Sequence, residues 1–184
     1  MADIGPSGRQ GHAVTFDSKI KRIVLFGGQG NQLLGDTWSW DGTEWTQEQD
    51  TGPTARMSHA VEYDETRDRV VLFGGFKGSD LNDTWEWDGS EWSQVADTGP
   101  TPRNGHGMVF DGTQVLLFGG QQGPVRRGDT WSWDGKHWTQ IQDIGPGPRT
   151  SAAMAYDSNR SRTVLFGGNG QTGELGDTWE LYER

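Results

Sequence analysis

The chain has no cysteine, so it contains no disulfide, no thiolate metal site and no thiol nucleophile. No segment repeats apolar residues with the 3.6-residue period of a helix over two or more turns. No apolar run approaches the length of a membrane-spanning helix, and the first residues lack the pattern of a signal peptide. We therefore expect an all-β fold without a disulfide framework, and the sequence leaves the cellular compartment open.

Positive charge is also scarce. The formal net charge is -10 at pH 7, and no basic stripe exists that could displace counterions from a nucleic acid. We expect neither nucleic acid nor a membrane as partner. Aliphatic residues are few, since only 31% of the chain is hydrophobic, but ten Trp and 29 Gly are present. Buried aromatic rings can supply the missing apolar area, and the glycines indicate many tight turns.

An internal repeat organises the whole chain. The motif Asp-Ile/Thr-Gly-Pro begins at Asp3, Asp50, Asp97 and Asp143. In phase with it come an Arg (Arg9, Arg56, Arg103, Arg149), then a His (His12, His59, His106, but Ala152 in the fourth unit). Each unit continues with an apolar run that ends in Gly-Gly and with Asp-Thr-Trp at Asp36, Asp83, Asp129 and Asp177. We expect one domain over 1–184 with repeats at about 3–49, 50–96, 97–142 and 143–184.

Each unit is predicted to form four short strands. In the first unit these are His12 to Phe16, Ile23 to Phe26, Thr37 to Trp40, and Trp45 to about Gln49. One such sheet cannot cover both of its apolar faces, so the units must stack, and stacking in a circle forms a propeller.

The repeat resembles the kelch repeat. The resemblance rests on the apolar run closing on Gly-Gly, on Arg9-x-x-His12-Ala13, and on the stretch Asp36 to Gly42, and it covers almost the whole chain. It implies a kelch-type β-propeller. Kelch propellers include protein-binding domains, enzymes acting on sugars and copper oxidases, so the resemblance alone does not select a function.

The chain departs from the family in two ways. Kelch propellers usually have five to seven blades, whereas four units are present here, and the fourth unit lacks its outermost strand. Three arrangements are open: a closed four-bladed monomer, half of a two-chain, eight-bladed ring in which a homodimer covers the end blades, or a piece of a longer protein. Of these we expect the monomer first and the two-chain ring second.

Candidate ligand-binding residues lie where a ring would collect them. Arg9, Arg56, Arg103 and Arg149 precede the innermost strands and could hold an anion at the mouth of the channel. Because they recur in every unit, the stronger expectation is a structural ion pair or backbone bond, for example to the Asp of Asp-Thr-Trp. His12, His59 and His106 could line the same mouth, although hydrogen bonding within each blade is the stronger expectation, and we expect no metal. The Trp pairs are expected to pack between blades rather than to stack on sugars.

Specificity is expected where the repeats differ, namely in the loops after Gly-Gly. Phe76, Lys77, Arg126 and Arg127 are the least expected residues there and are candidate recognition residues. The leading hypothesis is a non-catalytic module that binds a protein partner through one loop face and needs no cofactor. The alternatives are a propeller that binds carbohydrates or sugar acids and an enzyme resembling the kelch-type sugar mutarotases, for which no acid–base pair is found.

Overall fold

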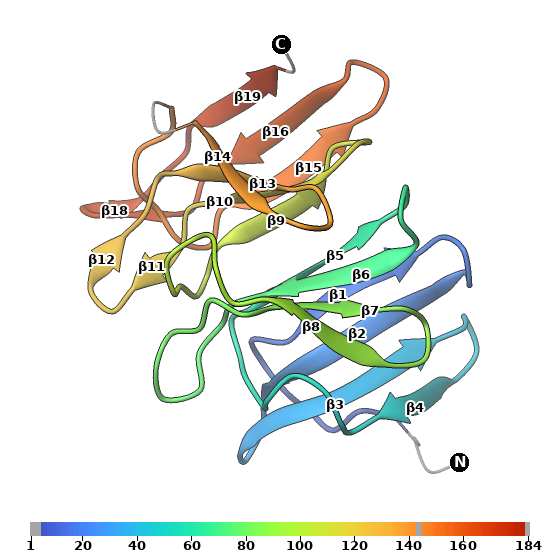
Figure 1. The fold of residues 1–184 in the computed structure, drawn as a ribbon. Helices are drawn as coiled ribbons and strands as arrows, with labels where there is room; N and C mark the ends of the chain where they lie inside the picture. The colour runs from blue at the N-terminus through green and yellow to red at the C-terminus, as the bar shows by residue number, and fades with distance from the viewer. Residues whose placement is uncertain (1–4, 143–144, 183–184) are drawn as a thin grey trace.

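The structure, a computed structural model, describes residues 5–142 and 145–182 (Figure 1). Within these ranges the regular structure is entirely β-strand, and no helix is present that could cross a membrane. The motif residues Asp3 and Asp143, predicted to open the first and fourth repeats, lie outside the described residues. The prediction of an all-β, four-bladed propeller arrangement is confirmed.

Each repeat forms one antiparallel sheet, here called a blade. Blade 1 consists of β1 (Ala13–Asp17), β2 (Arg22–Gln29), β3 (Leu33–Trp40) and β4 (Trp45–Gln49). Blade 2 consists of β5 (Ala60–Asp64), β6 (Arg69–Phe73), β7 (Thr84–Trp87) and β8 (Trp92–Ala96). Blade 3 consists of β9 (Gly107–Phe110), β10 (Val115–Phe118), β13 (Thr130–Trp133) and β14 (Trp138–Gln142). Blade 4 consists of β15 (Ala153–Asp157), β16 (Arg162–Phe166) and β19 (Thr178–Tyr182).

The second and third strands are longer in blade 1 than the sequence predicted. β2 and β3 continue past the double glycine, where Gly28 pairs with Leu34 and Gln29 with Leu33. In blades 3 and 4 the same loop forms small separate hairpins, β11 (Gln121–Gln122) with β12 (Val125–Arg126), and β17 (Asn169–Gly170) with β18 (Gly173–Glu174). Figure 1 shows these loop hairpins on one side of the molecule.

The core lies between blades rather than within them. One buried cluster joins blades 1 and 2, where Phe26 meets Trp92 edge-to-face with ring centroids 5.4 Å apart. A second joins blades 2 and 3, where Phe73 meets Trp138 in the same way at 5.2 Å. Such aromatic pairs add large apolar surfaces to the buried valine and leucine side chains of the core.

The double glycine is required by close approaches from two sides. Gly74 and Gly75 have φ of 61° and 101°, which disfavours any residue with a side chain. A Cβ at Gly74 would lie 2.7 Å from the carbonyl oxygen of Arg103 in the next repeat, and one at Gly75 would lie 2.8 Å from the Cβ of His59 in the same repeat. Gly74 therefore permits the close backbone contact with blade 3, and Gly75 permits the packing of His59 within its own repeat.

A chain of backbone hydrogen bonds links successive blades at the start of their inner strands. The Ser58 N–H donates to the Gly11 carbonyl, the Gly105 N–H to Ser58, and the Ser151 N–H to Gly105. The inner strands adjoin in the order β1, β5, β9 and β15. Among the described residues no hydrogen bond joins Ser151 back to Gly11, so this chain has two ends.

Both end blades present apolar side chains to solvent. Val14 and Phe16 of blade 1 are 51% and 55% exposed, and Phe166 of blade 4 is 55% exposed. The equivalent side chains of the inner blades, such as Val61 and Tyr63, are covered by the preceding blade. The closed four-bladed ring and the two-chain ring are two ways to bury these faces, and both stay predictions that a solution mass would separate.

Candidate functional site: the loop face of the propeller

The four repeat arginines lie at the junctions where the loop face meets the blades. Arg56 is fully buried, with its backbone bonded to blade 1 through the Gly28 N–H and the Leu34 carbonyl. Its side chain turns into blade 2, where it donates to the Gly74 carbonyl and to Asp83. Arg103 and Arg149 link blades 2 to 3 and 3 to 4 in the same way. Each of these arginines therefore connects two blades.

The N–H donors of each guanidinium are hydrogen-bonded to groups within the protein. The Arg56 Nη atoms donate to the two carboxylate oxygens of Asp83 at 2.6 and 2.7 Å. Its Nε donates to the Thr54 carbonyl, and Nη2 also donates to the Thr54 hydroxyl. Together with the bond from Nη1 to the Gly74 carbonyl, the Arg56 side chain makes five hydrogen bonds. Arg9 and Arg103 have matching sets. In blade 4 a glycine, Gly147, replaces the hydroxyl residue, so four bonds are formed.

The paired aspartates are ionised because several donors converge on them. Burial acts to raise the pKa of Asp83, but hydrogen bonds from Arg56 and the Trp85 indole outweigh it and hold the pKa below its usual range. Asp36 and Asp129 have the same partners and a lowered pKa. Arg149 and Trp179 hold the pKa of Asp177 well below its ordinary value. The repeated unit is thus an Arg–Asp–Trp network in which the arginine side chain is buried.

This network realises the ion pair that the sequence suggested as one role of the arginines. A ligand anion would have to displace a bidentate carboxylate from each fully bonded guanidinium, at the cost of a buried charge without a partner. Anion binding by these arginines stays a prediction, and the geometry assigns them a structural role as links between blades.

The three repeat histidines divide into two kinds. His59 and His106 are buried and lie edge-on to Phe26 and Phe73, each with ring centroids 5.4 Å apart. Burial, together with the nearby Arg56 and Arg103 charges, lowers the pKa of each to about 3. The His59 Nε2 lies 3.1 Å from the Phe26 carbonyl oxygen, across the blade boundary. His12, with no preceding blade over it, is exposed.

The predicted loop residues do not all lie free in solvent. Lys77 is exposed and Phe76 is half-buried, with its backbone bridged to Met57 and Asp80. Arg126 and Arg127 are not freely solvated, although charged side chains of a variable surface loop would be expected to be. Both are half-buried, because Arg126 donates to Asn169 of the blade 4 loop and Arg127 to Gln122 of its own hairpin.

Neighbouring loops are tied together into a continuous surface. The Asp80 carboxylate accepts from the Asn104 side chain at 2.5 Å and from the Gly123 N–H at 2.7 Å, which joins the blade 2 and blade 3 loops. Arg126 and Asn169 join the blade 3 and blade 4 loops. Loops held in this way on a rigid scaffold present side chains in fixed positions, as recognition sites require.

One set of surface residues was missed by the sequence reasoning. In every blade the residue after the arginine forms a backbone bridge with the residue after the double glycine. We call these four pairs the rim pairs: Gln10–Gln29, Met57–Phe76, Asn104–Gln121 and Thr150–Asn169. Their backbone is identical in each blade while their side chains differ, and all but the exposed Gln10 are half-buried. Variation directly beside invariant landmarks was the signal that could have found them.

Comparison with known proteins agrees with this architecture. The model of the KLHDC2/KLHL20/DRC7 Kelch-repeats domain matches residues 39–182. The chain belongs to this kelch-repeat family. No curated protein matches it.

The loop face of this kelch propeller carries contact groups of several chemical kinds. No group of three or more His, Asp or Glu side chains that could hold a metal occurs among the described residues. The half-buried Glu62, whose pKa is raised to about 7 by desolvation, accepts the Phe110 N–H between the inner strands of blades 2 and 3. The rim pairs instead offer amide, hydroxyl, thioether and aromatic groups at regular positions.

Proposed function

We propose that this kelch propeller is a non-catalytic module that binds a partner protein through the rim pairs of its loop face. The proposal rests on the different roles of the recurring and the variable residues of each repeat. The recurring Arg, Asp, Trp and Gly residues are engaged in holding blades together, whereas the rim pairs share one backbone geometry and carry a different side-chain pair in each blade. Fixed geometry with variable chemistry is the arrangement expected of a recognition surface.

The Met57–Phe76 pair is the expected centre of the contact. It is the apolar member of the rim pairs, and Met and aromatic residues are enriched in interface cores. The exposed Lys77 follows it directly, and the amide-bearing pairs Asn104–Gln121 and Gln10–Gln29 lie at equivalent positions of the two adjoining blades. An apolar centre with polar neighbours fits a peptide or loop of a partner protein.

The repeat itself supplies the variant that tests this function. In blade 1 the Met57 and Phe76 positions hold Gln10 and Gln29, so Met57→Gln with Phe76→Gln converts the blade 2 pair into one that the fold already accommodates. Peptides are selected against the wild-type chain from a display library, and their affinities are then measured by calorimetry for both chains. We expect the double variant to lose at least tenfold in affinity.

A matched control lies away from the rim. Val95 is 40% exposed on the outer strand β8, and Val95→Gln likewise replaces an apolar side chain with an amide. This control should leave the affinities unchanged. Selected peptides that bind the double variant as tightly as wild type would place recognition elsewhere and reject the proposal, as would a library that yields no binder at all.

A further inference from the structure

Arg127 stands at a position of the repeat that is leucine in the other three blades. In blades 2, 3 and 4 the residue at this position donates its N–H to the second glycine of Gly-Gly. In blades 1, 2 and 3 its carbonyl accepts the N–H of the arginine in the next repeat. Leu34, Leu81 and Leu175 occupy the position in blades 1, 2 and 4. The fold therefore accepts leucine here, and nothing in the backbone requires an arginine.

A second substitution in the same loop accompanies the arginine. In blade 4 the leucine lies over a glycine of its own loop, because a Cβ on Gly170 would lie 3.0 Å from the Leu175 Cδ1. In blade 3 Gln122 stands where Gly170 stands, and its side-chain oxygen accepts from the Arg127 Nη2 at 2.7 Å. A hydrogen-bonded polar pair thus replaces an apolar contact in the blade 3 loop.

Neutral groups hold both arginines of this loop, Arg126 and Arg127, here called the arginine pair. Arg126 donates through Nη2 to the Asn169 side-chain oxygen at 2.9 Å, just as Arg127 donates to Gln122. In the described chain neither guanidinium forms an ion pair, although most of the other arginines do and acidic residues outnumber basic ones by 26 to 16. An amide fixes a guanidinium without neutralising it, so both positive charges are uncompensated.

Part of the hydrogen-bonding capacity of the arginine pair is unused. Among the residues that the structure describes, neither Nη1 nor Nε of either side chain has a hydrogen-bond partner. Both Nε atoms are buried, whereas the Nη1 atoms are accessible. A buried donor without a partner destabilises the fold, and the leucine of the other blades has no such donor. Residues that break a repeated pattern at a cost to stability are expected at functional sites.

The arginine pair adjoins the rim pairs. Arg126 is paired in register with Gln121, and its hydrogen bond reaches Asn169, so it contacts rim residues of blades 3 and 4. Figure 1 shows the β11–β12 and β17–β18 hairpins as neighbours on the loop side of the molecule. Glu174, the acidic residue in register with Asn169, is exposed and leaves Arg126 unpaired in the described chain. A partner segment bound across the rim pairs would therefore pass beside two uncompensated positive charges.

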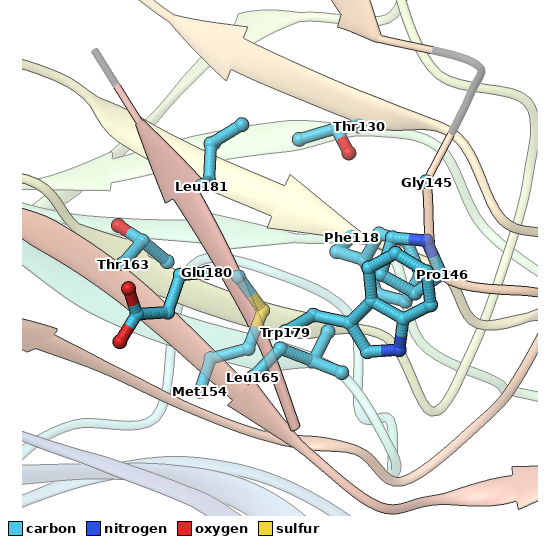
Figure 2. A pocket seen from close by; sticks show the side chains of 10 residues that line it. All are labelled: Phe118, Thr130, Gly145, Pro146, Met154, Thr163, Leu165, Trp179, Glu180 and Leu181. Atoms are coloured by element: carbon cyan, nitrogen blue, oxygen red, sulfur yellow. The ribbon is translucent and has the colours of Figure 1, made fainter. Parts of the chain in front are cut away.

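The cavity between blades 3 and 4 has a different character. It measures about 170 Å³ and is lined mainly by apolar side chains such as Phe118, Met154 and Leu165, with Glu180 as its charged member (Figure 2). Among the described residues no basic side chain lines this cavity, so an anion there would lack a countercharge. Of these two places, the arginine pair is the one whose chemistry suits an anion.

We propose that the arginine pair binds the side-chain carboxylate of an aspartate or glutamate in the partner segment, an inference that rests on the proposed function of the loop face. A guanidinium presents parallel N–H donors that match the oxygens of a carboxylate. The carboxylate accepts from the free Nη1 atoms and compensates the charge, while Asn169 and Gln122 keep the two side chains in place. Among the segments that the rim pairs can bind, the site thus selects those with an acidic residue.

The first measurement tests the anion site without a peptide. Sodium acetate replaces sodium chloride at constant ionic strength, and NMR follows the Nε–H signals of the arginines in the ¹⁵N-labelled chain. We expect two of these signals to shift saturably. Arg127→Leu should weaken this acetate binding severalfold, and so should Arg126→Gln, which keeps a donor for Asn169 but removes the charge. Lys77→Gln removes an exposed charge elsewhere on the loop face and should leave the shifts unchanged.

The second measurement uses the peptides selected against the wild-type chain and a parallel selection on the Arg127→Leu chain. Asp or Glu should be enriched at one peptide position with the wild-type chain alone. In calorimetry, replacing that acidic residue with its amide should weaken binding to wild type at least tenfold, whereas Arg127→Leu should bind both peptides equally. Arg127→Leu should melt at or above the wild-type temperature, because leucine fits this position in three blades, so lost binding does not reflect unfolding.

Three outcomes would overturn the proposal: no saturable acetate shift in the folded wild-type chain, selected peptides without an acidic preference, or a preference that persists in Arg127→Leu. A phosphoserine that raises peptide affinity more than tenfold over the acidic residue would also overturn it, by identifying phosphate as the anion. Failure of the loop-face function is distinguished, because the library would then yield no binder, or the Met57→Gln/Phe76→Gln chain would bind as tightly as wild type, with the acetate result unaffected.

Discussion

Arg103 and Asp129 face each other as a two-pronged ion pair, with Nη–O distances of 2.8 and 2.9 Å, across the start of blade 3. The guanidinium is fully buried and hydrogen-bonded at every donor. Arg103→Ala leaves the Asp129 charge without its partner, and removing one member of a buried pair destabilises a protein by about 3–5 kcal/mol. Urea unfolding should show this loss. A loss below about 1 kcal/mol would contradict the structural role and return the arginine to the ligand hypothesis.

Thr84 and Thr130 occupy equivalent positions but should respond differently to the same substitution. Thr84→Val removes the acceptor for the Trp138 indole N–H, and a buried donor left without a partner costs about 1–3 kcal/mol. Thr130 receives no indole among the described residues, so Thr130→Val should change the free energy of unfolding by less than about 0.5 kcal/mol. Equal losses of unfolding free energy for the two variants would contradict this difference, because they would mean that Thr130 also accepts a buried hydrogen bond.

His59 should make the protein sensitive to acid. Burial lowers its pKa in the folded protein to about 3, whereas the unfolded chain takes up a proton near 6.5. The unfolded state therefore binds more protons in this window, and stability falls as the pH is lowered from about 6.5 towards about 3. In His59→Gln the difference in unfolding free energy between pH 7 and pH 4 should be smaller than in wild type. The exposed His137→Gln serves as control and should leave that difference unchanged.

Glu62 should have the opposite effect to His59 on how the stability of the protein depends on pH. Burial raises its pKa to about 7 from an ordinary value of 4.5, so the folded protein holds a proton that the unfolded chain has lost. Its contribution therefore decreases stability as the pH rises from about 4.5 to about 7. Glu62→Gln should be relatively more stable than wild type at pH 8 than at pH 4.5, measured by thermal unfolding. A constant difference between the two chains across this range would contradict the assignment.

Arg126 and Arg127 should contribute to stability as well as to the loop surface. Replacing both with Ala removes the hydrogen bonds to Asn169 and Gln122, and half-buried bonds of this kind contribute about 0.5–1.5 kcal/mol each. We expect a measurable decrease in the melting temperature of the double variant, with Lys77→Ala as an exposed control that leaves it unchanged. An unchanged melting temperature in the double variant would restore the expectation of freely solvated side chains.

Most of the fold could be predicted because its determinants are local and repeated. The apolar run, the Gly-Gly pair and the Asp-Thr-Trp motif recur in phase, and each specifies a strand or a turn within its own unit. The lengthening of β2 and β3 past Gly27–Gly28 could not be predicted, because blade 2 has the same double glycine with the same kind of contacts to the next blade, and its strand β6 ends before it.

The candidate site could be predicted only in part. The partner of each arginine was suggested correctly from spacing, since Arg56 and Asp83 both flank strands of one blade. The contact between the Trp138 indole and the Thr84 hydroxyl could not be predicted. It joins residues 54 positions apart and depends on which face of each strand meets the neighbouring blade. The alternation of residue types along a strand shows that its sheet has two different faces. It does not show which neighbouring blade covers each face.

Arg56 links two blades, because its backbone bonds to the preceding blade and its side chain bonds to its own blade. This link bears on how the number of repeats can change in evolution. The same link recurs at Arg103 and Arg149, so this contact does not depend on which unit follows which. Duplication of an inner unit in the gene would preserve the arginine link at every internal junction. Selection on blade number would then act on the contacts that differ between junctions, such as the histidine position that Ala152 occupies in the fourth unit.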